Sequence, residues 1–246
     1  MDYGIGILGA SHYLPKKVQT NQELCEVMTD VTPDWIMTKT GIKRRYIATK
    51  EDSSSSMATV AAKKLLDKCN ISPDNIDLIV TATFSPDYMF PPVSAKIQLN
   101  LGAKNAQIID VNTNCTGFVT ALTVASDRMR IDETYEYALV IGVELHTRFI
   151  NPQDKETAIF FSDGAGVALL GKVKRGLGII NSKFLTDSTT YESVRFRGGG
   201  SSYPILNREF NPEIDFIEMN GLATWKQAIT NLPKVIKDLL LKSDLK

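Results

Sequence analysis

Short apolar segments rich in β-branched residues alternate along the chain with segments whose apolar residues recur at helical spacing. The strand-like segments are residues 3–8, 76–83, 107–111, 137–143, 165–170 and 176–184. The helix-like segments are residues 21–28, 57–69, 93–101, 115–130 and 222–242. Strands that are apolar on both faces and separated by helices are typical of a mainly parallel sheet covered on both sides. The pattern therefore predicts an α/β fold.

Several helix ends are marked by particular residues. Thr20 and Glu23 have the spacing of a capping box, which predicts that a helix begins at residue 21. Gly102 follows the apolar segment 93–101 and predicts its C-terminal end. Pro233 lies inside the last helical segment, where it is expected to kink or break the helix.

The pattern changes after Gly171, where a polar, glycine-rich stretch, residues 195–204, separates one strand-like segment from the final helix. We therefore predict two units, residues 1–172 and residues 173–246. The second unit holds too few elements for a closed core, and the last helix has no further strand to cover it. We therefore expect a complete first half, an incomplete second half and a truncated chain.

Composition excludes several classes of protein. The 246 residues carry 28 basic and 28 acidic side chains, with 43% apolar residues, so neither a disordered chain nor a dedicated nucleic-acid binder is expected. The start, MDYGIGILGA, lacks the basic region of a signal peptide, and no apolar run approaches the ~20 residues that span a membrane. Three cysteines without CxxC spacing predict neither a disulfide framework nor a zinc site. A cytoplasmic protein with no metal is expected.

Two glycine-rich stretches resemble nucleotide-binding loops. Gly4, Gly6 and Gly9 match GxGxxG, but the motif lies inside the first strand-like segment, and Pro15 prevents a regular helix soon after it. We interpret it as a closely packed strand. The stretch 198–202 (GGGSS) lacks the Lys of a phosphate-binding loop and is interpreted as a surface loop.

Cys115 is the strongest candidate for chemistry. It follows the strand-like segment 107–111 and stands where the next helix begins, so the unpaired N–H groups and the positive end of the helix dipole favour its thiolate form. Such N–H groups also stabilise an oxyanion on a bound acyl group. The alternative is a buried structural cysteine, an interpretation that suits Cys25 and Cys69 better.

Other candidate residues are fewer. The chain has two histidines, His12 and His146, either of which could serve Cys115 as a base, although each also fits a surface or loop position. Trp35 precedes a basic cluster formed by Lys39 and residues 43–45 (KRR). An aromatic ring beside cations suits a nucleotide, and a solvated basic loop is the alternative.

Several segments together resemble β-ketoacyl-acyl-carrier-protein synthase III, a family of the thiolase superfamily. The matching segments are 33–36 (PDWI), 40–42 (TGI), Arg45, 90–91 (FP), 110–118 (DVNTNCTGF), 142–144 (GVE), 161–166 (FSDGAG), 199–201 (GGS) and 219–221 (MNG). They occur in order over nearly the whole chain. The segments around Cys115 and Gly164 are the most specific.

The resemblance implies a thiolase-like fold of layered α-β-α-β-α type, usually in a homodimer. It implies that Cys115 accepts an acyl group from acyl-CoA and that the thioester condenses with malonyl-acyl-carrier-protein, with loss of CO₂. Trp35 matches the residue that stacks on the CoA adenine, Lys39 and Lys155 match positions near the nucleotide that often hold Arg, and Phe90 matches a residue of the acyl tunnel. Acyl-CoA and acyl carrier protein are then the partners, with no cofactor, nucleic acid or membrane.

The resemblance also shows a departure. The family's catalytic His and Asn lie in the second half, and neither His12 nor His146 aligns with that His. The implied function is an acyltransferase that starts fatty-acid synthesis, with a condensing enzyme of secondary metabolism as the alternative. Hydroxymethylglutaryl-CoA synthase is disfavoured, because the stretch before Phe90 contains Asp87 but no Glu. A catalytically silent half-fold and a hydrolase that pairs Cys115 with His146 are the other hypotheses.

Overall fold

The computed structural model describes residues 2–206 and 208–245, which form two compact units. The first unit comprises Met1–Lys17, Ala48–Leu145 and Asp163–Ile180, and the second comprises Val18–Ile47, His146–Ser162 and Asn181–Lys246. The segments of the two units are therefore interleaved along the chain. The predicted boundary at residues 172 and 173 falls inside the first unit, and the division into two thiolase-like halves stays a prediction.

A five-stranded sheet forms the centre of the first unit, in the order β1-β7-β6-β4-β5. The strands are β1 (Tyr3–Tyr13), β4 (Leu78–Ala82), β5 (Gln107–Val111), β6 (Tyr137–Leu145) and β7 (Asp163–Lys174). Strand β4 pairs in parallel with β5 and β6, whereas β7 pairs antiparallel with both β1 and β6. The prediction of a mainly parallel sheet was wrong. The connection between β6 and β7 contains the short 3₁₀ helix η3 (His146–Phe149) and no α-helix, whereas the crossover between parallel neighbours is usually an α-helix.

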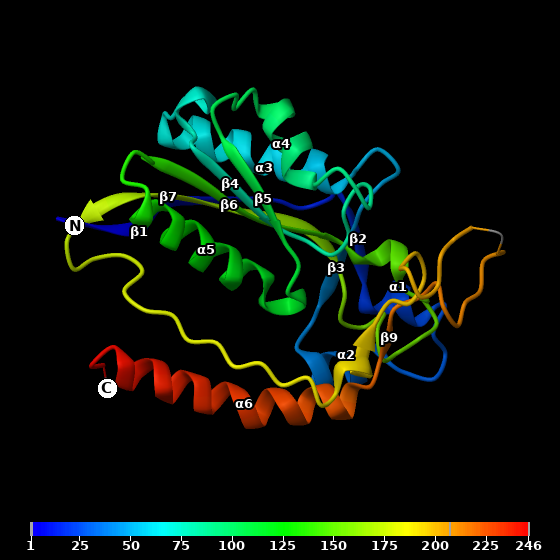
Figure 1. Ribbon diagram of the computed structural model, residues 1–246. Coiled ribbons are helices and arrows are strands. Elements are labelled where there is room, and N and C mark those ends of the chain that lie inside the picture. Colours follow the sequence, from blue (N-terminus) through cyan, green and yellow to red (C-terminus); the bar gives the residue numbers. More distant parts are fainter. Residues whose placement is uncertain (1, 207, 246) are drawn as a thin grey trace. The chain divides into compact units, whose positions relative to one another are not determined.

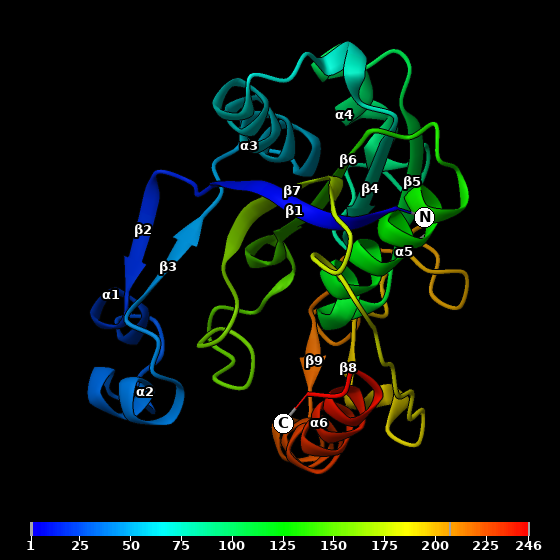
Figure 2. The same ribbon diagram turned by 90° about the vertical axis from the view of Figure 1, so that its left-hand side faces the viewer.

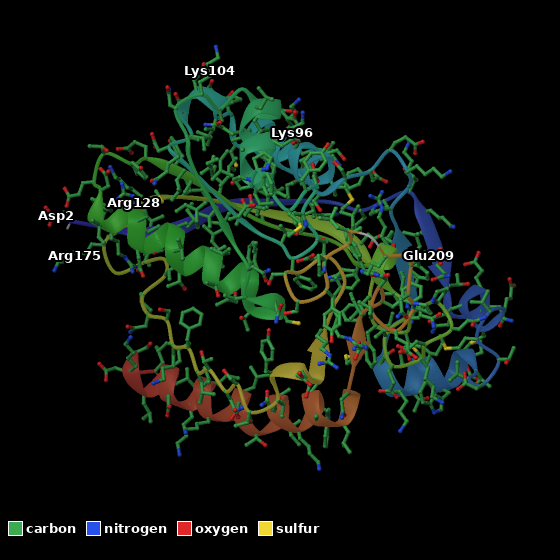
Figure 3. The ribbon with its side chains drawn as sticks, turned by 45° about the vertical axis from the view of Figure 1, so that its right-hand side comes forward. Asp2, Lys96, Lys104, Arg128, Arg175 and Glu209 are labelled. Carbon is green, nitrogen blue, oxygen red and sulfur yellow. The ribbon has the colours of Figure 1, made fainter. Side chains whose placement is uncertain are left out.

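Helices cover both faces of this sheet, as predicted (Figures 1 and 2). Helices α3 (Ser54–Cys69) and α4 (Val93–Leu101) pack on one face, and α5 (Gly117–Ile131) packs on the other. Residues alternate between the faces along each strand, so Ile79 belongs to the core under α3 and α4, whereas Val80 belongs to the core under α5. Charged side chains such as Lys96 on α4 and Arg128 on α5 lie on the outer sides of their helices (Figure 3).

The local signals read from the sequence are largely confirmed. Helix α4 and strand β5 have the predicted bounds, and Gly102 ends α4 with a left-handed φ of 73°. The capping box of Thr20 and Glu23 begins α1 (Asn21–Cys25). Helix α3 begins three residues earlier than predicted, because Ser53 accepts a hydrogen bond from the Ser56 N–H at 3.2 Å and caps the helix. The 3₁₀ helix η1 (Pro73–Asn75) follows α3.

The first glycine motif lies within β1 and is closely packed, as predicted. A Cβ atom on Gly4 would overlap the carbonyl oxygen of Leu177, and one on Gly9 would lie 2.8 Å from the Cys69 Sγ. The predicted strand over residues 176–184 is absent. Gly176 and Gly178 have φ values of 86° and 92°, which an extended strand does not contain.

The second unit is built from short elements around a small apolar core. It contains β2 (Lys17–Thr20) paired with β3 (Arg44–Ile47), β8 (Val194–Arg195) paired with β9 (Glu218–Met219), α1, α2 (Pro33–Thr40), η4 (Tyr191–Ser193) and α6 (Gly221–Lys242). The core includes Leu24, Ile36, Ile159 and Ile217. The stretch 198–202 forms no helix or strand, and residues 200–202 are exposed, as predicted for a surface loop, but Gly198 is buried.

Helix α6 runs through Pro233 without interruption, so the predicted break is not found. No residue of this helix is buried, and Leu222, Trp225, Ile229 and Leu232 are each at least half exposed on an amphipathic helix. Among residues 2–206 and 208–245, no helix is long and apolar enough to cross a membrane.

Candidate active site

Cys115 lies in a turn that joins β5 to α5. Residues Asn114–Thr116 form the 3₁₀ helix η2, and Asn114 has a left-handed φ of 49°. Helix α5 therefore begins at Gly117, two residues later than predicted. A side chain at residue 117 would lie 3.1 Å from the Ala82 Cβ on β4, so a glycine lets this helix start close to the sheet.

The Cys115 thiol is exposed, which contradicts the alternative of a buried structural cysteine. Hydrogen bonds fix the turn around it: the Thr113 carbonyl accepts from the Thr116 hydroxyl at 2.8 Å, and the Thr113 hydroxyl donates to that of Thr120 at 2.9 Å. The thiol is thus accessible on a turn of defined shape, directly before the first turn of a 15-residue helix.

Cys25 and Cys69 differ from Cys115 in their surroundings. Both are partly buried, and they pack against the apolar cores of the second and first units respectively. Burial raises the pKa of the Cys25 thiol, and the nearby charge of Arg45 opposes that rise only in part. Their interpretation as structural residues is confirmed.

Cys115 lies at the carboxyl ends of the three parallel strands β4, β5 and β6. In the register of the sheet, Ala82 of β4 is paired with Val111 of β5 and with Gly142 of β6. Cys115 follows β5, and Glu144 lies two residues beyond Gly142. The carboxyl ends of parallel strands are the usual place for an active site in α/β proteins.

Glu144 ends the matching segment 142–144, and no role for it was predicted from the sequence. Burial raises its pKa to about 7, although the hydroxyls of Ser85 and Thr83 and the Phe84 N–H donate to the carboxylate and lower the pKa. The signal available in the sequence was a carboxylate in the otherwise apolar segment 137–145. A partly buried carboxylate with a pKa near neutral pH is a common feature of functional sites.

Phe90 belongs to the first unit with Cys115, but its side chain is 83% exposed. It lies in the segment between β4 and α4, next to the exposed side chains of Tyr88 and Met89, and its peptide bond with Pro91 is cis. Its role in lining an acyl tunnel stays a prediction.

Trp35, Lys39 and Lys155, the predicted CoA contacts, all belong to the second unit. Trp35 is 38% exposed in the first turn of α2, and Lys39 is exposed in the last turn. The Lys155 ammonium lies 2.6 Å from the Asp30 carboxylate, which raises the pKa of Lys155. Their role in nucleotide binding stays a prediction.

Arg45 does not belong to a solvated basic cluster. It is 1% exposed, and its guanidinium donates to the Ile159 carbonyl at 2.5 and 3.1 Å and to the Asn21 side chain at 2.9 Å. Burial lowers its pKa. The prediction placed Arg45 with Lys39 because charge alone cannot distinguish a surface cation from one that satisfies buried carbonyl oxygens.

The two histidines differ in burial. His12 is exposed in β1, opposite Gly166 of β7. His146 is 8% exposed in η3 and packs edge-on against the Phe161 ring, with centroids 5.0 Å apart. His146 is therefore buried and not at the surface, although it lies in the connection between β6 and β7, as the alternative of a loop position predicted.

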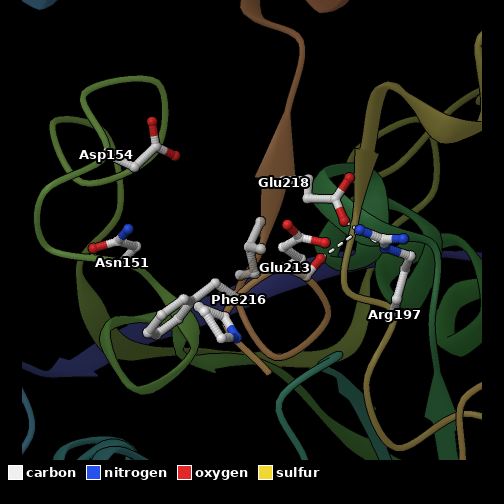
Figure 4. Close-up of a pocket in the computed structure, with 8 residues that line it drawn as sticks. Asn151, Asp154, Arg197, Glu213, Phe216 and Glu218 are labelled. Atoms are coloured by element: carbon white, nitrogen blue, oxygen red, sulfur yellow. Dashed lines mark hydrogen bonds and ion pairs between the residues drawn. The ribbon is translucent and has the colours of Figure 1, made fainter. Parts of the chain in front are cut away.

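A pocket of about 340 Å³ lies within the second unit (Figure 4). Its lining includes Asn151, Asp154, Arg197, Glu213 and Glu218. The Arg197 guanidinium is paired with the Glu218 carboxylate at 2.5 Å. None of the residues predicted from the sequence to bind substrate lines this pocket. Over the described parts of the chain, no three His, Cys, Asp or Glu side chains gather as a metal site would require.

The layered sheet, with an exposed cysteine at the junction of the edge strand β5 and the following helix, defines a thiolase-like condensing acyltransferase. The structure aligns with 3-oxoacyl-[acyl-carrier-protein] synthase III from Aquifex aeolicus VF5 with a TM-score of 0.81 and 31% identity, over 99% of this chain and 73% of that one. It aligns with the Thermus thermophilus β-ketoacyl-[acyl-carrier-protein] synthase III with a TM-score of 0.85 and 28% identity, over 98% and 73% of the two chains.

Sequence comparison agrees with the fold. The family model for 3-oxoacyl-[acyl-carrier-protein (ACP)] synthase III matches residues 109–188, which include Cys115. The chain is 37% identical over 240 residues to the β-ketoacyl-[acyl-carrier-protein] synthase III of Caldanaerobacter subterraneus subsp. tengcongensis, a match that covers 98% of this chain and 72% of that protein. The corresponding enzyme of Ehrlichia canis is 38% identical, with coverages of 97% and 72%. The chain belongs to the β-ketoacyl-acyl-carrier-protein synthase III family.

These matches confirm the resemblance seen in the sequence and the thiolase-like α/β fold. The expectations of a truncated chain and of a partial second half are not confirmed; the matches cover 98% and 99% of this chain and 72% and 73% of the relatives.

Proposed function

We propose that this protein starts fatty-acid synthesis by joining an acyl group from acyl-CoA to malonyl-acyl-carrier-protein. The exposed Cys115 thiol, at the start of α5 and within the segment that matches the family, is the observation that carries the proposal. Relatives named β-ketoacyl-acyl-carrier-protein synthase III at 37% and 38% identity favour this role over that of a sister enzyme in secondary metabolism.

In the first half-reaction, the Cys115 thiolate attacks the carbonyl carbon of the acyl-CoA thioester. The tetrahedral intermediate collapses, the CoA thiolate leaves and takes up a proton, and the acyl group remains on Cys115 as a new thioester. The first N–H groups of α5 have no partner within the helix, and its dipole is positive at that end. Both features favour the negative charge on the thiolate and on the intermediate.

In the second half-reaction, the malonyl group loses its free carboxylate as CO₂. The electron pair left on the adjacent carbon attacks the carbonyl carbon of the Cys115 thioester. The carbon–sulfur bond then breaks, the product is a 3-oxoacyl-acyl-carrier-protein, and the Cys115 thiolate is restored.

We assign the remaining predicted residues to substrate binding. The partly exposed Trp35 ring is available to stack on the CoA adenine, and the charges of Lys39 and Lys155 suit its phosphates. Lysine lacks the planar fork of arginine, so these contacts are expected to be less specific in direction. Phe90 is assigned to the acyl chain. CoA is a substrate in this scheme, and no separate cofactor takes part.

We also propose that the protein acts as a cytoplasmic homodimer. The neighbouring side chains of Tyr88 and Met89 are 70% and 76% exposed, and adjacent apolar side chains at a surface favour burial against a partner. Sedimentation velocity tests the proposal: wild type should sediment as a dimer and Met89→Asp should shift toward a monomer.

Intact mass tests the chemistry. Incubation with acetyl-CoA and other short acyl-CoAs should add one acyl mass to the wild-type chain and none to Cys115→Ala. The matched control Cys69→Ala should still gain the acyl mass, because Cys69 is partly buried in a core. An adduct that persists in Cys115→Ala would contradict the assignment of the nucleophile. Release of free acid without a condensation product would indicate a hydrolase instead.

A further inference from the structure

The segment of residues 83–92 joins β4 to α4 and carries Phe90. Its first residues are held by Glu144 of β6: one carboxylate oxygen accepts from the Phe84 N–H at 3.1 Å, and the other accepts from the Ser85 hydroxyl at 2.5 Å. The same Ser85 hydroxyl oxygen accepts from the Leu145 N–H at 2.9 Å. The beginning of the segment is therefore tied to two successive residues of β6.

The end of the segment is held by a second carboxylate from the opposite neighbour of β4. Asp110 of β5 accepts hydrogen bonds from the Val93 N–H at 2.7 Å and from the Ser94 N–H at 3.0 Å. These are the first residues of α4, whose N-cap residue Pro92 provides no side-chain hydrogen bond. Asp110 thus supplies the missing cap from five residues before Cys115.

A third carboxylate fixes the middle of the segment. The Asp87 side chain accepts from the Ser55 N–H at 3.0 Å, at the start of α3. The backbone around Phe90 is consequently fixed at several points, although the Phe90 side chain is 83% exposed. An exposed aromatic side chain on a firmly anchored segment is held in one region and remains accessible to a substrate.

A glutamate at position 144 is less favourable energetically than a neutral residue would be if its only role were structural. A buried carboxylate carries a desolvation penalty, which a neutral hydrogen-bonding residue of similar shape avoids. The raised pKa of Glu144, about 7, reflects that penalty. Asp110 lies on β5 and Glu144 on β6, the two parallel strands that pair with β4. Both residues lie toward the carboxyl ends of these strands, the end that Cys115 follows.

We propose that Glu144 and Asp110 are positioning residues for acyl-donor selectivity, because together they fix both ends of the 83–92 segment and so set the place of Phe90. The proposal rests on the proposed function for its link to the acyl chain. The anchoring itself does not depend on that function, so the two are tested separately.

Hydrogen–deuterium exchange tests the anchoring without any substrate. Glu144→Gln should increase exchange in peptides that cover residues 83–92 by at least about threefold, since an NH₂ donor replaces one of the two oxygens that accept from Phe84 and Ser85. Peptides that cover β7 should be unchanged. Glu136→Gln removes a carboxylate that is 59% exposed, just before β6, and serves as the matched control. Unchanged exchange of residues 83–92 in Glu144→Gln would overturn the proposal.

Acylation rates of Cys115 by two-, four- and eight-carbon acyl-CoAs test selectivity. We expect Glu144→Gln and Asp110→Asn to change the ratio of kcat/KM between the shortest and longest donor by about tenfold, and Glu136→Gln to leave it unchanged. A uniform loss with every donor would mean a merely structural role and would refute the proposal. Wild type that accepts no acyl group would refute the proposed function, and the exchange result would still decide the anchoring.

Discussion

Replacing Glu144 by glutamine should change how the stability of the protein depends on pH. The folded protein holds the pKa of Glu144 at about 7, against 4.5 for a free side chain, with burial as the main cause. A carboxyl with a raised pKa binds its proton more tightly in the folded state than in the unfolded state. Its contribution to stability is therefore fully present below pH 4.5 and is lost as the pH rises through about 7.

The size of this effect follows from the same two values. One pKa unit corresponds to about 1.36 kcal/mol, so the full change between low and high pH is roughly 3 kcal/mol. Most of it is lost before neutral pH, which leaves about 1 kcal/mol between pH 6 and pH 8. Glu144 is only partly buried, and solvent screening makes these figures upper values. The glutamine side chain of the variant has no titrating proton, so this component disappears.

Urea unfolding at pH 6, 7 and 8, at one ionic strength, measures the effect. The free energy of unfolding of Glu144→Gln should rise relative to that of wild type by up to about 1 kcal/mol as the pH increases over this interval. Glu136→Gln, at a side chain that is 59% exposed and paired with Lys172, serves as the control. Parallel curves for Glu144→Gln and wild type would refute the reasoning, because they would mean that Glu144 titrates alike in both states.

Three further substitutions test the fold. Arg45→Ala leaves the Ile159 carbonyl without its guanidinium donors and opens a cavity, so urea unfolding should show a loss of roughly 3–5 kcal/mol; a loss below about 1 kcal/mol would contradict the burial of Arg45. Ser53→Ala removes the cap of α3 and should cost about 1 kcal/mol in the same assay, with no loss if the cap is not formed. Gly178→Ala forces a Cβ onto a residue with φ of 92° and should lower Tm by several degrees, whereas Gly166→Ala, with open space around it, should lower Tm much less; equal shifts would contradict this difference.

Elements with local end signals could be predicted from the sequence, and the pairing of strands could not. Helix α4 was located correctly because Gly102 adopts the left-handed conformation that ends a helix. Strand β7 was located correctly, but its direction depends on how residues 146–162 return the chain to the sheet, and no short motif encodes that path. The apolar sequence of β7 fits either direction, since both faces of the sheet are covered.

The candidate site was predictable to the extent that its chemistry is local. Cys115 could be found because a strand, a short turn and a helix follow one another in the sequence, and that order alone places a thiol before a helix. Arg45 shows the opposite case: its guanidinium meets a carbonyl oxygen 114 residues later, so its sequence neighbours misled the assignment.

One property of Glu144 follows from its own strand, as for Cys115, and another depends on a distant partner, as for Arg45. Alternation along β6 places Val140 in the core on the α5 side and Ile141 in the core on the opposite side. Glu144 lies four positions after Val140, so it is expected on the α5 side and partly covered. What it binds depends on β4 being its neighbour in the sheet, because the donors Phe84 and Ser85 come from the segment after that strand. The partial burial of Glu144 can therefore be predicted from the sequence of one strand. Its hydrogen bonds to the segment that carries Phe90 can be predicted only when the order of the strands is known.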